Sequence, residues 1–570
     1  MMKKRSIMMS AAAVLSFGSL LASLGTAASA HTTPKLSGIT NGGTIVQTFS
    51  TQFGANMIPM LDSSVYTQQI LGYQFDTLLS IDQNDHLIGD LVNKWWYSKD
   101  RKTIFFQLSP KAKWSNGKPV TIADVKLGID WLASKSYNNA DQGSYGYLVQ
   151  NIVGASNPIT DGTTPSGFKQ ISNSEFSLTM AQPDAAVLGS MWQGIQPLPS
   201  FLLGKIPMSK WKSSQYDKFI PVGSGAYIMT QIIPGQSVTM KANPYYVMGV
   251  PHISTNVFKV VSPDVVDGDL ASGQVTIAGI QHKDYAAMKK VPGLNFTITP
   301  NNAFDYLGWR LNNAVYGKEF SNVKFRQAVE YAINRPALIN ALEKGFATIE
   351  NGPLPPVNFW YNKALNNAYA FSPAKANQLL DQAGFKIKNG WRTTPGGRPF
   401  TPTLTITSGD SQIATEATFI KSFLNAVHIN LVVNPPINFN TVLNQLNGDA
   451  NGKQPIQGFL LAWNLSNDPD PRGLWRATDN LNITSIDWTN TKDPAVVLND
   501  KLIHEQHTAA AFDISYRKNI LDQWQTLVSK NMPENFLYDG ESIMAYSNKL
   551  HGVVFSPYGL LFPYRWYLSN

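Results

Sequence analysis

Residues 73–125 read YQFDTLLSIDQNDHLIGDLVNKWWYSKDRKTIFFQLSPKAKWSNGKPVTIADV and hold strand and helix patterns side by side. Residues 103–108 (TIFFQL) are rich in the β-branched and aromatic types that strands favour. Residues 121–124 (TIAD) resemble a capping box with Asp in place of Glu, and Ile129 and Leu132 follow at helical spacing. The stretch therefore predicts strands and helices mixed in one chain.

The same mixture continues on both sides of this stretch. Residues 44–49, 237–240, 403–406 and 429–433 read as short strands. Residues 372–383 read as a helix that begins at Ser-Pro and stops before a glycine. Pro and Gly turns separate these elements, and such a mixture favours α/β lobes over a β-sandwich or a helix bundle.

The composition excludes several classes of protein. The 570 residues include no cysteine, which excludes disulfides, thiolate metal sites, cysteine nucleophiles and a lipid-modified cysteine anchor. Lys and Arg outnumber Asp and Glu by 46 to 38 without forming a dense basic block, which argues against nucleic-acid binding. Charged residues make up only 15%, against about 25% in typical soluble proteins. We hypothesise from this shortage that the protein is adapted to acid, where fewer carboxylates would change charge.

The first thirty residues predict a secretory signal peptide. Lys3, Lys4 and Arg5 form a positive segment, an apolar and small-residue run follows, and residues 28–30 (ASA) offer a cleavage site. No later stretch approaches the run of about 20 apolar residues that a membrane-spanning helix needs. We therefore expect the protein to lie outside the cytoplasm, in the periplasm or at the exterior of the cell envelope. The length of the chain predicts about three domains.

The catalytic and metal motifs that the chain suggests do not survive inspection. His504 and His507 are three residues apart, whereas a zinc-protease helix needs histidines four apart, so we interpret residues 504–507 as a solvated helical face. Residues 223–225 (GSG) lack the spacing of a nucleophile elbow, and no glycine-rich phosphate loop occurs. Residues 468–471 (DPDP) are the densest acidic feature and read as a rigid turn. The residues alone thus indicate an exported, aromatic-rich α/β protein with several lobes. A ligand-binding cleft is compatible with such a protein, but the residues alone do not predict one.

Five segments, in order, resemble the family of bacterial extracellular solute-binding proteins typified by the oligopeptide- and dipeptide-binding proteins of ABC importers. Residues 73–125 resemble the opening signature of that family, with Asn116 and Arg101 as small departures. The resemblance covers nearly the whole chain after the signal peptide. The other four segments are PVGSGAYIMTQIIPGQSVTMKANPYYV (221–247), FSNVKFRQAVEYAINRPALI (320–339) followed by GPLPP (352–356), FSPAKANQLLDQAGF (371–385) and GLLFPYRWYLSN (559–570).

The resemblance implies a class II periplasmic-binding-protein-like α/β fold. Family members look like two α/β lobes joined by a hinge, with an extra domain inserted in the first lobe. Ligand would sit between the lobes, which close on it by hinge bending. Mapped onto this chain, the expected parts are the first lobe (37–62, 172–297 and 537–570), the inserted domain (63–171) and the second lobe (298–536), after a signal peptide at 1–30.

The resemblance also implies a function without catalysis or cofactor. We expect a monomer that captures peptides and delivers them to the membrane permease of an ABC importer. Some family members bind oligosaccharides, and a Trp-rich chain with few charges suits stacking on sugar rings, so an oligosaccharide ligand stays open. A secreted hydrolase is a remote alternative that no motif supports.

The family's ligand segment in the second lobe suggests the first candidate residues. In peptide binders this segment resembles W-x-x-D-x-x-[DE]-P, and its first Asp pairs with the α-amino group of the peptide. Here the segment begins at Trp463 and Asn464, is one residue shorter, and has Ser466 where that Asp would stand. The resemblance therefore leaves the amine anchor open, with Asp468 and Asp470 as possible replacements and a structural turn as the alternative.

Further candidates come from positions where family members face ligand. For each of them, core packing is the alternative interpretation. They are Ser50 and Phe53 after the first strand, Tyr145 and Tyr147 in the inserted domain, Phe304, Tyr306, Trp309 and Asn312 where the chain enters the second lobe, and Asn438 and Phe439 further along.

Overall fold

The structure is a computed structural model that describes residues 41–62, 64–138, 143–155, 158–447 and 456–569. The predicted signal peptide lies outside these residues. None of the helices in the described ranges combines the length and apolar character needed to cross a membrane.

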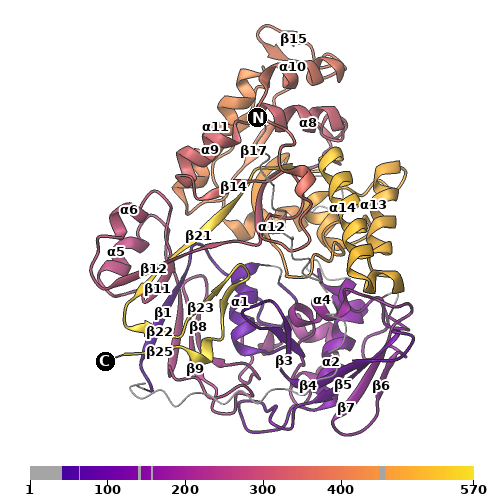
Figure 1. The fold of residues 1–570 in the computed structure, drawn as a ribbon, viewed down its shortest axis with the longest axis vertical. Helices are drawn as coiled ribbons and strands as arrows, with labels where there is room; N and C mark the ends of the chain where they lie inside the picture. The colour runs from indigo at the N-terminus through magenta and orange to yellow at the C-terminus, as the bar shows by residue number, and fades with distance from the viewer. Residues whose placement is uncertain (1–40, 63, 139–142, 156–157, 448–455, 570) are drawn as a thin grey trace, which may run out of the picture.

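An eight-stranded mixed sheet organises the lower half of the molecule in Figure 1. Its order is β12-β21-β11-β1-β10-β9-β8, and β14 joins it by pairing with β21. We call the part of the chain built on this sheet the first lobe. The strands are β1 (Thr44–Phe49), β8 (Tyr227–Ile233), β9 (Ser237–Ala242), β10 (Thr255–Val260), β11 (Ile277–Gly279), β12 (Leu294–Pro300), β14 (Ala347–Ile349) and β21 (Tyr538–Ser547).

A four-stranded antiparallel sheet lies beside the first lobe and has the order β4-β5-β7-β6. Its strands are β4 (Val92–Tyr97), β5 (Thr103–Leu108), β6 (Phe168–Gln170) and β7 (Glu175–Thr179). Helix α2 (Ile122–Ala133) packs with it and begins at the predicted capping box, with Thr121 and Asp124 capping each other. One apolar cluster runs from Phe49 in β1 through this region, so the sheet shares its core with the first lobe.

A five-stranded sheet with the order β18-β17-β19-β13-β20 organises the second lobe, in the upper half of Figure 1. Separate apolar clusters cover its two faces, one containing Leu307 and Trp309 and the other Phe304 and Tyr306, as alternation along β13 requires. The strands are β13 (Ala303–Trp309), β17 (Thr403–Thr405), β18 (Val432–Val433), β19 (Gly458–Asn464) and β20 (Asn535–Phe536).

Helices surround both lobes, and several begin or end as the sequence predicts. Helix α10 begins at Pro373 with the hydroxyl of Ser372 accepting from the Lys375 amide, and Gly384 follows it at a φ of 88°. Besides α2 and α10, the described helices of eight residues or more are α1 (Val65–Gln74), α4 (Val187–Gly194), α8 (Val323–Ala332), α11 (Ser411–Ala426), α12 (Phe439–Asn447), α13 (Pro494–Glu505) and α14 (Ile514–Asn531).

The chain crosses between the two lobes at two adjacent places. It leaves β12 and enters β13 at residues 301–302, and it leaves β20 and enters β21 at residue 537. The Leu537 amide donates to the carbonyl of Asp305, so the crossings are tied together. These paired crossings have the geometry of a hinge between two lobes.

Candidate functional site

Strand β19 carries an unpaired backbone edge in the second lobe. It pairs with β13 over its whole length, from Gly458 opposite Trp309 to Asn464 opposite Ala303. On its other side, β17 reaches only Gly458 and Phe459. No strand of the described chain pairs with residues 461–464 on that side, and the side chains of Ala462 and Asn464 are exposed. An extended ligand could add here as one more strand.

Trp463 lies on the opposite face of β19 from Ala462 and Asn464. It is opposite Phe304 in the neighbouring strand and packs against the same apolar cluster, yet it keeps part of its surface exposed. Phe304 and Tyr306 are almost completely buried within that cluster. The structure thus brings three predicted ligand residues together, with Trp463 at the surface of the group.

Trp309 is buried as deeply as Phe304 and Tyr306, and it packs in the apolar cluster on the other face of the sheet. Its side chain is 1% exposed, its indole N–H donates to the amide oxygen of Asn535 at 3.0 Å, and its ring packs on Phe320 and Phe325. Asn312, three residues on, is exposed. Core packing accounts for the burial of Trp309, which was the alternative interpretation of this residue.

The loop after β1 meets the second lobe at the start of α12. The hydroxyls of Ser50 and Tyr66 are 2.7 Å apart, and the Tyr66 ring meets the edge of Phe439. The side-chain amide of Asn440 donates to the carbonyl of Phe53, and that of Asn438 donates to Gln52. The predicted candidates Ser50, Phe53 and Phe439 therefore lie near one another across the boundary between the lobes.

Tyr145 and Tyr147 lie at the other end of this boundary. Both rings pack against the apolar cluster of the first lobe and keep part of their surface exposed. A Cβ placed on Gly473 of the second lobe would lie 2.5 Å from the Tyr147 ring, and Gly473 has a φ of 82°. Glycine is required at position 473 for both reasons, and its absence of a side chain lets the lobes approach.

Both carboxylates of residues 468–471 already have cationic partners. Asp468 accepts two hydrogen bonds from Arg517, at 2.6 and 2.8 Å, and Asp470 accepts from Arg472 at 2.6 Å. These pairs argue against the idea that either carboxylate replaces the missing amine anchor. The Ser466 hydroxyl, at the anchor position itself, donates to the carbonyl of Asp468 at 2.5 Å.

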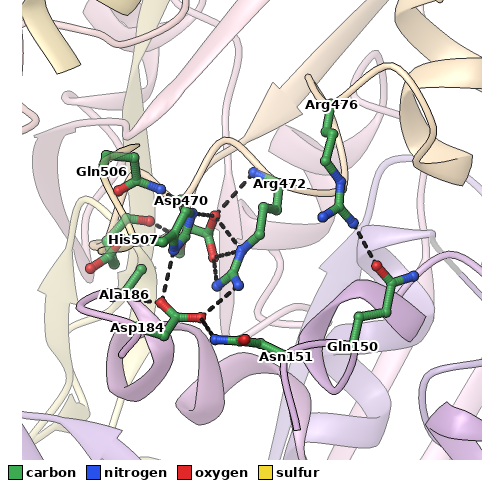
Figure 2. A network of polar contacts seen from close by, with 12 residues as sticks. Gln150, Asn151, Asp184, Ala186, Asp470, Arg472, Arg476, Gln506 and His507 are labelled. Carbon is green, nitrogen blue, oxygen red and sulfur yellow. Dashed lines mark hydrogen bonds and ion pairs between the residues drawn. The ribbon is translucent and has the colours of Figure 1, made fainter. Parts of the chain in front are cut away.

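Asp470 and Arg472 belong to a charged group that spans the two lobes (Figure 2). Asp184, from the segment between β7 and α4, accepts from Arg472 at 2.6 Å and lies 2.8 Å from Nδ1 of His507. The other ring nitrogen of His507 lies 3.0 Å from Asp470. We call Asp184, Asp470, Arg472 and His507 the interlobe network.

The interlobe network is buried, and its charges compensate one another. Its four side chains are between 0 and 8% exposed. Burial by itself would raise the pKa of Asp184 and Asp470, but Arg472 and His507 outweigh burial and hold both pKa values below the usual range. In reverse, the two carboxylates raise the pKa of Arg472.

Sequence reasoning missed this network. Residues 504–507 were interpreted as a solvated helical face, and that is wrong for Gln506 and His507, which follow the end of α13 and are buried. Only His504 is exposed. The DPDP segment was a visible signal, whereas Asp184 lies 323 residues from His507 and has no local motif to mark it.

Four other carboxyls gather where the chain crosses between the lobes, and we call Asp305, Glu350, Glu416 and Asp539 the hinge carboxyls. Burial raises the pKa of all four, to about 7 for Glu416 and about 8 for Asp539. Their mutual repulsion adds to this, since Glu416 and Asp539 raise the pKa of Asp305. Arg335 lowers the pKa of Glu350, but burial and the charge of Asp539 outweigh it, so the pKa of Glu350 stays raised.

A cavity of about 880 Å³ lies apart from these residues, beside β14 where that strand pairs with β21. Its lining includes Pro336, Thr348, Tyr361 and Lys363. None of the predicted ligand residues lines it, so it does not correspond to the predicted site. We base the candidate site on the edge of β19 and on the boundary between the lobes.

Residues 86–485, well over half of the chain, match the family model described as bacterial extracellular solute-binding proteins, family 5. The chain belongs to this family. The family-5 membership confirms the resemblance seen in the sequence and the expected class II binding-protein fold. It also confirms the expectation of a binding protein and not an enzyme.

The family-5 relatives are distant in sequence and close in fold. The chain is 22% identical over 466 residues to the oligopeptide-binding protein AppA of Bacillus subtilis, covering 80% of this chain and 79% of AppA. The structure of that AppA with a nonapeptide has a TM-score of 0.82 at 20% identity, over 93% of this chain and 100% of AppA. Lactococcal OppA with a peptide in the closed conformation has a TM-score of 0.81 at 18% identity, over 92% of this chain and 99% of OppA.

Proposed function

We propose that this protein captures peptides outside the cytoplasmic membrane and delivers them to the permease of an ABC importer. The observation that carries the proposal is the unpaired edge of β19 at residues 461–464, with Trp463 beside it. Main-chain hydrogen bonds along such an edge hold an extended peptide whatever its sequence. The names of the relatives, which include oligopeptide- and dipeptide-binding proteins, support the same ligand class.

The remaining parts of the proposal follow from the family and the sequence. The first lobe, the inserted domain and the second lobe would act as rigid parts that close around the ligand. The protein would work as a monomer that has lost residues 1–30 and has no cysteine for a lipid anchor. Water in roomy side-chain pockets would let peptides of different sequence bind.

Ligand that co-purifies with the protein tests the proposal most directly. We expect denaturation of the purified protein to release peptides that mass spectrometry then identifies. A thermal-shift screen of peptides of two to eight residues against short glycans gives an independent answer, because a ligand at a hundredfold excess over Kd stabilises the folded state by about 2.7 kcal/mol. Hits among glycans alone would replace peptide by oligosaccharide, and cleavage of a hit would point to a hydrolase.

A further inference from the structure

The interlobe network is the most completely buried charged contact between the two lobes that the described residues contain. On the first-lobe side, Asp184 is held by the side-chain amide of Asn151 at 3.2 Å and by the amide of Ala186 at 3.1 Å. On the second-lobe side, Arg472 is held by Asp470 through both Nε and Nη2. Each half of the network is therefore organised within its own lobe, ready to meet the other half (Figure 2).

Further contacts beside the interlobe network cross the same boundary. The amide of Ala185 donates to the carbonyl of His507 at 3.1 Å, and Arg476 donates to the side chain of Gln150 at 2.6 Å. Gly189 of α4 lets the Asp468 side chain approach, since a Cβ there would lie 2.5 Å from it. These contacts show that the two surfaces fit closely around the interlobe network.

Separation of the lobes affects the two aspartates differently. Asp470 stays with Arg472 and His507, because all three belong to the second lobe. Asp184 loses its contacts with Arg472 and His507 and gains water. A closed state without the Asp184 carboxylate keeps the Arg472–Asp470 pair but loses the charge-assisted contacts of Asp184 with Arg472 and His507, which are the buried charged contacts that join the two halves. Asp184 is thus the member whose removal affects closure while each lobe remains intact.

The ligand edge of β19 leads directly into the network. Only Leu465, Ser466 and Asn467 separate residues 461–464 from Asp468. The side-chain amide of Asn302, at the crossing between the lobes, donates to the carbonyls of Leu465 and Ser466 at 3.0 and 2.7 Å. A ligand strand on β19 would therefore restrict the position of the segment that places Asp470 and Arg472 opposite Asp184.

We propose that Asp184 is a positioning residue for ligand capture: its contacts with Arg472 and His507 form a latch that holds the occupied lobes closed. This inference rests on the proposed function, because a latch matters only if closure accompanies occupancy. The latch would set how long and how tightly ligand is held without touching the ligand.

The absence of cysteine allows closure to be measured directly. Cysteines introduced at the exposed positions Lys99, in the four-stranded sheet region, and Lys492, in the second lobe, would be the only thiols and would carry spin labels for distance measurements. The probe is a tryptic digest of serum albumin added to protein stripped of ligand by unfolding and refolding. We expect the digest to shorten the distance between the two spin labels in wild type. Asp184→Asn should need a digest concentration at least about tenfold higher for the same shortening.

Two variants keep this experiment specific. Asp130→Asn removes another buried carboxylate, at 3% exposed, which pairs with Lys126 inside one helix of the inserted region, so it should close like wild type. Asp184→Glu keeps the charge and should restore part of the closure. Melting temperatures verify that each variant is folded.

Each outcome decides between the alternatives. Closure of Asp184→Asn at the wild-type digest concentration overturns the latch and leaves the peptide proposal standing. If the digest closes neither protein, the peptide proposal fails. The latch is then tested by the distances between the spin labels without ligand. A smaller short-distance fraction in Asp184→Asn than in wild type supports it, and equal fractions overturn it.

Discussion

The interlobe network and the hinge carboxyls are both buried and both adjoin β19, yet their carboxyl groups have opposite chemistry. Asp184 and Asp470 face Arg472 and His507, and their pKa values are lowered. Burial raises the pKa values of Asp305 and Glu416, and the neighbouring carboxyls raise them further. The difference teaches that the partner, and not burial, decides whether a buried carboxyl is charged near neutral pH. One group attracts across the boundary of the lobes, and the other is tolerated only when it is neutral.

Removal of Arg472, the cation shared by Asp184 and Asp470, should have the largest effect on stability, because it takes away the partner that distinguishes the interlobe network from the hinge carboxyls. Arg472→Ala leaves Asp184 and Asp470 buried beside each other without the guanidinium that pairs with both, so we expect the free energy of unfolding to fall by about 3–5 kcal/mol. Chemical denaturation measures it. Lys501→Ala, which breaks the exposed pair with Glu505, should cost about 1 kcal/mol or less. Equal losses in the two variants would show that the network has no special role.

The strand between the two groups provides the second test. Trp463→Ala should weaken binding of a peptide ligand by roughly 1–3 kcal/mol, a factor of about five to a hundred and fifty, because it removes a partly exposed aromatic wall beside the ligand edge. Isothermal titration with a peptide found in the purified protein measures it. Trp391→Ala, in the β-hairpin β15 (Ile387–Lys388) and β16 (Trp391–Arg392), is the matched control with an exposed ring. A large loss of stability with normal binding would place Trp463 in the core.

A pH series should separate the two groups by sign. The hinge carboxyls have raised pKa values, so the stability they contribute is complete below about pH 4 and is lost as the pH rises through about 7 for Glu416 and about 8 for Asp539. Asp184 and Asp470 have lowered pKa values, so their contribution is complete above about pH 4 and is lost only in stronger acid. We therefore expect lower thermal stability at pH 8 than at pH 5.

Substitution of one hinge carboxyl identifies the source of that slope. Glu416→Gln should flatten the loss between pH 5 and pH 8 by about 1 kcal/mol or more, whereas Asp184→Asn should leave the slope unchanged. Thermal unfolding at a series of pH values measures both. A rise in wild-type stability from pH 5 to pH 8 would contradict the assignment and also the hypothesis of adaptation to acid.

The smallest expected effect concerns the amino terminus of the ligand. Asp468 and Asp470 are paired with Arg517 and Arg472, and Ser466 stands at the anchor position. N-acetylation of a bound peptide should therefore change its Kd by less than about threefold. Titration of the same peptide in free and acetylated forms measures it, and a loss of tenfold or more would show that a carboxylate of the site binds the amine.

The elements that are local in the sequence could be predicted, and the site between the lobes could not. The capping box at residues 121–124 and the strand at 44–49 depend on neighbours a few residues away, and the structure confirms both. Family signatures led correctly to the fold. The interlobe network depends instead on Asp184 meeting His507 across 323 residues, which no local pattern encodes. Trp309 was ambiguous for a related reason, because an aromatic side chain reads the same in a core and in a cleft.

The prolines of residues 468–471 have a mechanical consequence. Asp468 and Asp470 each precede a proline, which restrains the aspartate to extended backbone, and each proline fixes its own φ. Few rotations remain inside the segment, so it behaves as a short stiff lever. A displacement at its β19 end is transmitted to Asp470 as a movement and is not absorbed as a change of shape. A Gly-rich segment of the same length could join the same two points. Because it is flexible, however, a movement of one end would not move the other.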